Sequence, residues 1–313
     1  MSEPTPTFDR TAADYPVASL SPAVRDIVTD ALPRPDRSLA VVLCQVAREV
    51  SLDAGDCASA TDTPDPEEVD SPTADPTTDL VTAVGCFEGY VEIRADLLAD
   101  ERYGRPTDRD AAVLASDYLH AAAYTQIGGL TDSSRRTASM YQVLTRGSTA
   151  LATAFHVQSA DARDDATDSR TPDAVLAGTA SELGATAAGA TEDAREALER
   201  YGRSLLGAIA AHPSPSDAVG DVAALVLSGR PEEAAVERDA KASSSSKPRD
   251  DTHTATVRRH VERAREAITT LERSGGRADE RSKTDSRPMS RSPLSRLERA
   301  TRIPFADVVD DDA

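Results

Sequence analysis

Apolar side chains recur at helical spacing along most of the chain, beginning between Ser21 and Val50. There they fall three or four positions apart in two runs, which are separated by Pro33 and Pro35. The apolar positions of the two runs are Val24, Ile27, Val28, Leu32, Leu39, Val42, Leu43, Val46 and Val50. This pattern predicts a helix, a bend at the prolines and a second helix.

The helical pattern continues through the middle of the chain. It returns from Leu80 to Leu98, and the segment YGRPT at 103–107 interrupts it before an alanine-rich helix that ends at Gly128-Gly129. Further helices are predicted over about 133–159, 172–189, 191–212 and 215–228. Valine and isoleucine do not alternate with polar residues as they do in strands. The sequence therefore predicts an all-α helical bundle.

Polar stretches set the expected limits of this bundle. Residues 53–78 contain several prolines, many acidic residues and no aromatic residue, so we expect a disordered acidic loop. The first part of the chain, 1–20, is expected to be a flexible N-terminus. The predicted helical core therefore spans 21–230 and is interrupted once by the acidic loop.

The C-terminal part begins with a predicted linker at 231–251, which ends in KASSSSKPRDD. Residues 252–313 are expected to form helices that dock on the core, with a flexible Ser/Arg-rich stretch at about 274–292. The first of these helices carries an apolar stripe suited to docking. The stripe consists of Val257, Val261, Ala264, Ile268 and Leu271.

The charge of the chain narrows the possible partners. The 313 residues include 54 acidic and 35 basic ones, giving a formal net charge of −19. Such a charge argues against binding to nucleic acid or to anionic membranes. An acidic surface repels itself, and concentrated salt screens this repulsion. The acidic excess, together with basic residues that are almost all arginine, is therefore typical of a halophilic protein. Most acidic clusters are therefore expected to be solvated surface.

The cysteines and the apolar runs indicate a cytoplasmic protein. Cys44, Cys57 and Cys86 have no CxxC spacing, so we expect free thiols in a reducing compartment. The first residues have neither a basic start nor an apolar stretch, and no run of about 18 apolar residues predicts an integral membrane segment. Motifs of nucleotide-binding proteins and serine hydrolases are also missing from the sequence.

Three segments resemble parts of a known protein family, and they occur in the same order and at similar spacing. They are RPDRSLAVVLCQVAREV at 34–50, DERYGRPTDRDAAVLASDYLHAAAYTQI at 100–127 and VLAGTASELGATAAGATEDAREALERYGRSLLGAIAAH at 175–212. In this order they resemble the trans-type isoprenyl diphosphate synthases, or polyprenyl synthetases. The chain looks like a divergent, haloarchaeal-type relative, and the resemblance implies a helical bundle of the class I isoprenoid synthase type.

The resemblance also implies diphosphate contacts. The first segment is similar to a GKxxRP motif, with Arg34 near the lysine position and Arg37 on the arginine. The second is similar to an RRGRPT motif, in which Arg102 and Arg105 match. The third matches at Leu183-Gly184-Ala185 and Tyr201-Gly202-Arg203, but lacks the family's opening lysine-threonine pair. The four arginines are the implied contacts, because guanidinium groups bind phosphate oxygens in pairs.

The metal-binding motifs of the family are incomplete in this chain. In that family, DDxxD motifs on two facing helices hold magnesium on the diphosphate of the substrate. The first motif should fall in EIRADLLAD at 92–100, where Asp96 and Asp100 are the expected carboxylates on one helical face. The second should follow Ile209, but only Asp217 matches it, after two prolines. The resemblance thus implies magnesium as a cofactor only if the protein is active.

The predicted function follows from arginines that are present and aspartates that are missing. The preferred hypothesis is a polyprenyl synthetase-like protein without canonical chain elongation, which binds an isoprenoid or its diphosphate or is a non-catalytic partner of an active synthase. Its predicted assemblies are a homodimer or a heterodimer with that synthase. One alternative is an active magnesium-dependent prenyltransferase that uses Asp96, Asp100, Asp217 and Asp221. Another is a helical interaction module that binds no phosphate.

Overall fold

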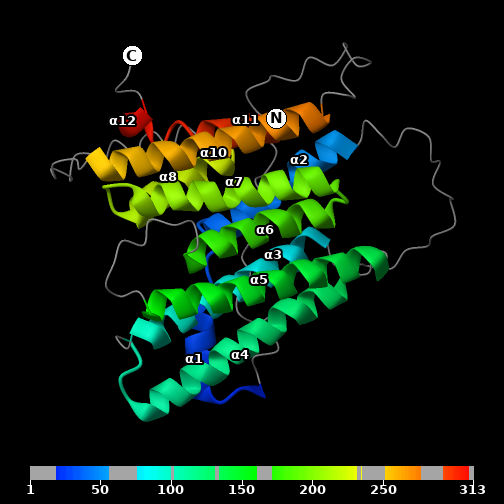
Figure 1. Cartoon of the computed structure of the whole chain (residues 1–313). Helices are drawn as coiled ribbons and strands as arrows, with labels where there is room; N and C mark the ends of the chain where they lie inside the picture. Colours follow the sequence, from blue (N-terminus) through cyan, green and yellow to red (C-terminus); the bar gives the residue numbers. More distant parts are fainter. Residues whose placement is uncertain are drawn as a thin grey trace, which may run out of the picture.

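The computed structural model shows an all-α protein, and this confirms the predicted fold class. It describes residues 19–55, 76–99, 102–130, 134–160, 171–230, 234, 251–275 and 292–309. Within these ranges, every helix or strand assigned is a helix (Figure 1). The helices are α1 (Pro22–Ala31), α2 (Leu39–Gly55), α3 (Pro76–Ala99), α4 (Pro106–Gly129), α5 (Ser134–Ala160), α6 (Pro172–Ala187), α7 (Glu192–Ala211), α8 (Ser216–Leu227), α10 (Asp251–Gly275), α11 (Pro293–Ala300) and α12 (Ala306–Val309).

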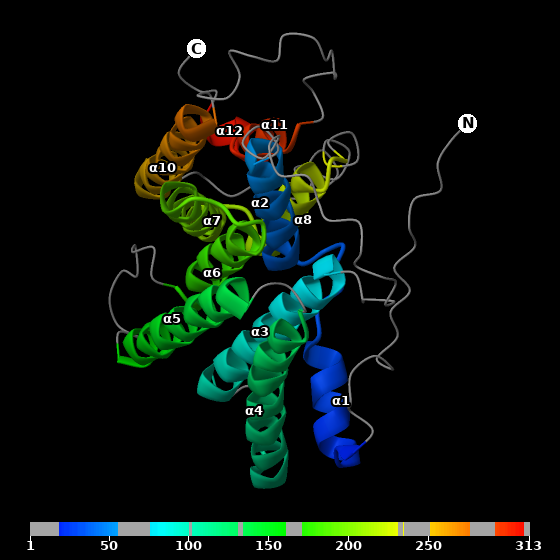
Figure 2. The ribbon, with the colours of Figure 1, turned by 90° about the vertical axis from the view of Figure 1, so that its right-hand side faces the viewer.

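Two helices, α2 and α6, form the centre of the bundle (Figure 2). Both contribute side chains to two apolar clusters, one shared with α1, α3, α4 and α5 and the other with α7, α8 and α10 to α12. Almost every residue of α6 is buried, which explains its wealth of alanine and glycine. At Gly184 a β-carbon would overlap the backbone carbonyl of Cys44 in α2. The central pair therefore depends on small residues for its close approach.

The C-terminal helices α10, α11 and α12 pack on the core. The stripe on α10 from Val257 to Leu271 is buried, and α10 packs along α7. The buried hydroxyl of Tyr201 in α7 donates a hydrogen bond of 2.9 Å to the backbone oxygen of Leu297 in α11. Nearby, Arg296 donates to the backbone oxygen of Leu227 at the end of α8, at 3.0 Å. These contacts join the C-terminal segment to the core.

Several element boundaries differ from the predicted loops. Helix α2 continues to Gly55 and α3 begins at Pro76, so both ends of the predicted acidic loop are helical, and residues 56–75, including Cys57, lie outside the described part. Proline in the first turn suits a helix start, because the missing amide hydrogen has no partner there. Likewise, α10 extends to Gly275, within the stretch predicted to be flexible. Most of the predicted linker also lies outside the described residues.

The described helices include none that is both long enough and apolar enough to cross a membrane.

Candidate functional site

A cavity of about 320 Å³ lies between α2, α3, α6 and α7. Its apolar lining includes Leu39 of α2, Leu176 of α6 and Leu206 of α7. Four carboxylates also line it. They are Glu88, Glu92 and Asp96 of α3 and Asp173 of α6. The cavity thus combines an apolar wall with a strip of acidic groups.

The three carboxylates of α3 share one face of the helix because they are four residues apart. Residues spaced by four lie one turn above another on a helix. Along this face, Glu88 is partly buried, whereas the side chains of Glu92 and Asp96 are 48% and 32% exposed. The strip therefore runs from the interior of the cavity to its rim near the end of α3.

Glu88 is bound to the start of α2. Its carboxylate accepts a hydrogen bond from the hydroxyl of Ser38, and the Ser38 Oγ in turn accepts from the backbone N–H of Val41 at 3.0 Å. Ser38 thus caps α2 while it binds Glu88. Burial raises the pKa of Glu88 to about 7, against the opposing effect of the Ser38 hydrogen bond, and the charges of Glu92 and Asp173 raise it further. This carboxyl group titrates near neutral pH.

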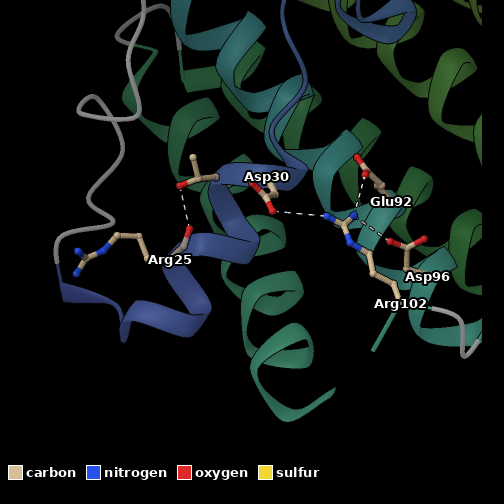
Figure 3. Close-up of polar contacts among 6 residues, drawn as sticks. Arg25, Asp30, Glu92, Asp96 and Arg102 are labelled. Atoms are coloured by element: carbon tan, nitrogen blue, oxygen red, sulfur yellow. Dashed lines mark hydrogen bonds and ion pairs between the residues drawn. The ribbon is translucent and has the colours of Figure 1, made fainter. Parts of the chain in front are cut away.

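At the rim of the cavity, one guanidinium group binds three carboxylates (Figure 3). The Nη1 atom of Arg102 lies 3.2 Å from Oδ2 of Asp96 and 3.5 Å from Oε1 of Glu92. Its Nη2 atom lies 3.6 Å from Oδ2 of Asp30 at the end of α1. We call Arg102, Asp30, Glu92 and Asp96 the Arg102 cluster. It joins α1, α3 and the segment that leads into α4.

The other charges of the Arg102 cluster affect the protonation of Glu92. Burial raises the pKa of Glu92, Arg102 lowers it, and the charges of Asp96 and Asp30 raise it. The hydrogen bond to Asp96 contributes most to raising the pKa of Arg102. One guanidinium group therefore interacts with three carboxylates, and the cluster keeps a net negative charge.

The geometry does not fit a magnesium cage. In the described ranges, no group of three or more His, Cys, Asp or Glu side chains is arranged to hold a metal ion. Magnesium requires several oxygen ligands in near-octahedral geometry. Glu92 and Asp96 are instead paired with Arg102, and α7 lines the cavity with Leu206.

Solved structures provide the decisive comparison. A geranyltranstransferase from Methanosarcina mazei superposes with a TM-score of 0.53 at 17% identity, over 92% of this chain and 91% of that one. The chain has the isoprenoid synthase fold. At this identity the similarity concerns the fold alone. No protein-family model and no curated protein sequence matches the chain.

Two further solved structures give lower TM-scores. A geranylgeranyl pyrophosphate synthetase from Pyrococcus horikoshii gives a TM-score of 0.46 at 13% identity, over 89% of this chain and 94% of that one. A geranylgeranyl pyrophosphate synthase from Corynebacterium glutamicum, complexed with isoprenyl diphosphate and magnesium, gives 0.45 at 16% identity, over 90% and 97%.

Within the isoprenoid synthase fold, the arginines predicted as diphosphate contacts lie in different settings. Arg34 and Arg37 are exposed in the segment between α1 and α2, and the backbone N–H of Arg37 donates to the oxygen of Arg34 at 2.9 Å. Arg105 is exposed directly before α4. Arg102 belongs to the cluster described above. In the described lining of the cavity, none of the four is present.

The two predicted metal ligands that the structure describes, Asp96 and Asp217, are not brought together. Asp96 lies in the cavity, and Asp217 is exposed in the first turn of α8 and does not line it. Asp100 lies outside the described residues. Two prolines, Pro213 and Pro215, lie between α7 and α8, so the chain leaves the α7 axis before it reaches Asp217.

Sequence reasoning missed several carboxylates at this site. Glu92 opens the segment in which the first motif was expected, yet only the aspartates of that segment were considered. The four-residue spacing from Glu88 through Glu92 to Asp96 was the available signal. Asp30 and Asp173 are distant in sequence from this helix, and no local pattern connects them to it.

Two further hollows, of about 520 and 400 Å³, adjoin one another between α5, α6 and α7. Both are lined by Arg146 and Glu182, which form an ion pair, and the second is also lined by Arg203 and Glu199, whose Nε and Oε1 atoms lie 2.6 Å apart. These charges are therefore already paired with each other. The cavity with the four carboxylates is therefore the better candidate site.

Proposed function

We propose that this chain is a polyprenyl synthetase-like protein that does not catalyse metal-dependent chain elongation. It holds an isoprenoid or its diphosphate in the cavity, and acts as a ligand-binding protein or as a non-catalytic partner of an active synthase. The fold and the apolar part of the cavity support the choice of ligand. The observation that carries the proposal is Leu206, the apolar side chain that α7 contributes to the same cavity as the carboxylates of α3.

The physical argument concerns the departing diphosphate. Its developing negative charge has to be met by metal ions and cationic groups, and the metal ions in turn need carboxylate ligands that are free to bind them. Here the carboxylates of α3 are partly neutralised by Arg102, and the described part of α7 adds none to the cavity lining. Losing one preorganised group of this kind commonly costs at least about 100-fold in rate.

For a diphosphate ligand we propose Arg34 and Arg37 as the contacts. Arg37 precedes the cavity residue Leu39 by two positions, and both arginines are exposed and thus accessible to a ligand. Arg105 is a further candidate. Arg102 is the weakest of the four predicted contacts, because three carboxylates already surround it.

The test is a paired binding and activity assay in concentrated KCl. Allylic and homoallylic diphosphates are titrated into the full chain by isothermal calorimetry, with and without Mg²⁺, and the same samples are analysed for elongated product. We expect binding that does not require Mg²⁺, weakened in Arg34→Gln/Arg37→Gln, and no product. Binding that requires Mg²⁺, together with an elongated product, would refute the proposal.

A second candidate is a divergent magnesium-dependent prenyltransferase. The observation in its favour is that four carboxylates, from α3 and α6, line one cavity. This candidate requires Arg102 to leave Glu92 and Asp96 when substrate and metal bind. It predicts product from the wild-type chain and none from Glu92→Gln/Asp96→Asn, which separates it from the preferred function.

A further inference from the structure

The side chains that line the cavity offer no cation to an anionic ligand. Seven of the lining residues are apolar and four are acidic, and the described lining contains no arginine, lysine or histidine. A diphosphate is bound by cationic groups and hydrogen-bond donors, whereas here it would meet carboxylates. The head group that suits this lining therefore carries no negative charge.

Two of the four carboxyl groups lie apart from the Arg102 cluster. They are Glu88 on α3 and Asp173 in the first turn of α6. The Oε2 atom of Glu88 accepts a hydrogen bond from Ser38, and in the described part of the chain its Oε1 atom accepts none. The exposed side chain of Asp173 forms no hydrogen bond or ion pair with any described residue. Both carboxyl groups thus have oxygen atoms available to a ligand.

A hydroxyl group matches this pair of carboxyl groups. Burial raises the pKa of Glu88 to about 7, and the charges of Glu92 and Asp173 raise it further. Below neutral pH, Glu88 therefore carries a proton that it can donate, while Asp173 accepts. A hydroxyl group accepts one hydrogen bond and donates another, whereas an ammonium group only donates and a diphosphate only accepts.

We propose that the cavity binds an isoprenoid alcohol in preference to its diphosphate. The hydroxyl group accepts a hydrogen bond from Glu88 and donates one to Asp173, and the chain lies against the apolar wall. The volume of about 320 Å³ is at the lower end for ligand-binding pockets, which suits a short chain. The inference rests on the proposed function and deepens it, since it names the class of isoprenoid that the cavity holds.

The test compares ligands that share one chain and differ in the head group. Geraniol, geranyl diphosphate and geranylamine are titrated separately into the full chain by calorimetry at pH 6, in concentrated KCl without Mg²⁺. We expect geraniol to bind at least about tenfold more tightly than geranyl diphosphate. Geranylamine should also bind more weakly than geraniol, because its ammonium group accepts no hydrogen bond from Glu88.

Two pairs of variants locate the site. Ala95→Phe places a ring in the cavity and should abolish geraniol binding, whereas Ala121→Phe, at an exposed position of α4 outside the lining, should not. Asp173→Ala should weaken geraniol binding about fivefold through the loss of one hydrogen bond. Asp193→Ala removes an exposed acidic residue from the first turn of α7 and should leave the affinity unchanged.

The pH dependence of the wild-type chain provides a readout that needs no variant. Between pH 6 and 8 the affinity for geraniol should fall by up to about tenfold, because Glu88 loses the proton that it donates. The groups that face Glu88 are Ser38, Glu92 and Asp173, and α7 contributes to the lining only Leu206, which does not titrate. This arm remains decisive if Ala95→Phe does not fold.

The inference is overturned if geraniol binds no more tightly than geranyl diphosphate or geranylamine. It is also overturned if a folded Ala95→Phe keeps the wild-type affinity, or if the affinity for geraniol does not change between pH 6 and 8. The proposed function fails on a different result, the formation of elongated product by the wild-type chain with Mg²⁺. The two failures are therefore distinguishable.

Discussion

The carboxyl group of Glu88 should make the protein less stable as the pH rises towards neutrality. Burial raises its pKa from 4.5 to about 7, and the groups that face it are the Ser38 hydroxyl, Glu92 and Asp173. Between these two values the folded chain holds a proton that the unfolded chain has released. The stability that this proton contributes is complete below pH 4.5 and is lost as the pH rises through 7.

Glu88→Gln should remove this loss of stability at higher pH. The glutamine side chain is neutral and nearly isosteric with the protonated acid, and its carbonyl oxygen still accepts the hydrogen bond from Ser38. Each pH unit between the two pKa values is worth about 1.4 kcal/mol, so the free energy of unfolding at pH 8 should rise by up to about 3 kcal/mol. Below pH 4.5 the variant and the wild type should be equally stable.

The measurement is denaturant unfolding at pH 4, 6 and 8 in the same concentrated salt. Glu262→Gln, an exposed position on α10, is the control for loss of one negative charge and should show no comparable change. The reasoning is refuted if Glu88→Gln is no more stable than the wild type at pH 8. An equal gain in the free energy of unfolding at pH 4 would also refute the reasoning, because a gain at that pH could not come from the protonation of Glu88.

The remaining predictions concern packing and a buried hydrogen bond, and all are read from denaturant unfolding. Tyr201→Phe should lower the free energy of unfolding by about 1–2 kcal/mol, because it leaves the α11 carbonyl without its donor. Tyr118→Phe should cost little, since the buried Tyr118 hydroxyl has no hydrogen-bond partner among the described residues; an equal loss in both variants would contradict this. Gly184→Ala should cost about 1–3 kcal/mol or prevent folding, because its methyl group would overlap the carbonyl of Cys44. Gly104→Ala has open space, and a loss as large there would argue against the packing explanation.

The helices were predictable because their apolar positions repeat at a single period. The predicted stripe on α10 is buried, and the limits of α5, α6, α7 and α8 all lie within two residues of the predicted ones. Near Gly55 and Pro76 the prediction placed the loop boundaries inside the helices. There the local composition is polar, yet the helices continue past their last packed turns. Periodicity reports the buried part of a helix better than its ends.

The site was less predictable, because its key contacts are not local. The sequence places Arg102 in a motif that implies a diphosphate contact, but the spacing of residues cannot show that its side chain turns back to Glu92 and Asp96. The contribution of Asp30 depends on how α1 packs beside α3. The strip of carboxylates on α3 was visible as a four-residue repeat, and its omission came from searching for aspartates alone.

The charges around the cavity are balanced in two different ways, and this bears on what it can hold. At the rim, Glu92 and Asp96 are compensated by the Arg102 guanidinium. Further inside, none of the described cationic side chains is in contact with Glu88, and its raised pKa means that a proton neutralises it below about pH 7. A neutral carboxyl group beside Leu39 and Leu176 is compatible with an apolar chain, whereas a diphosphate placed there would meet acidic groups. The charge pattern therefore favours an isoprenoid chain inside the cavity, with any diphosphate outside it, towards Arg34 and Arg37.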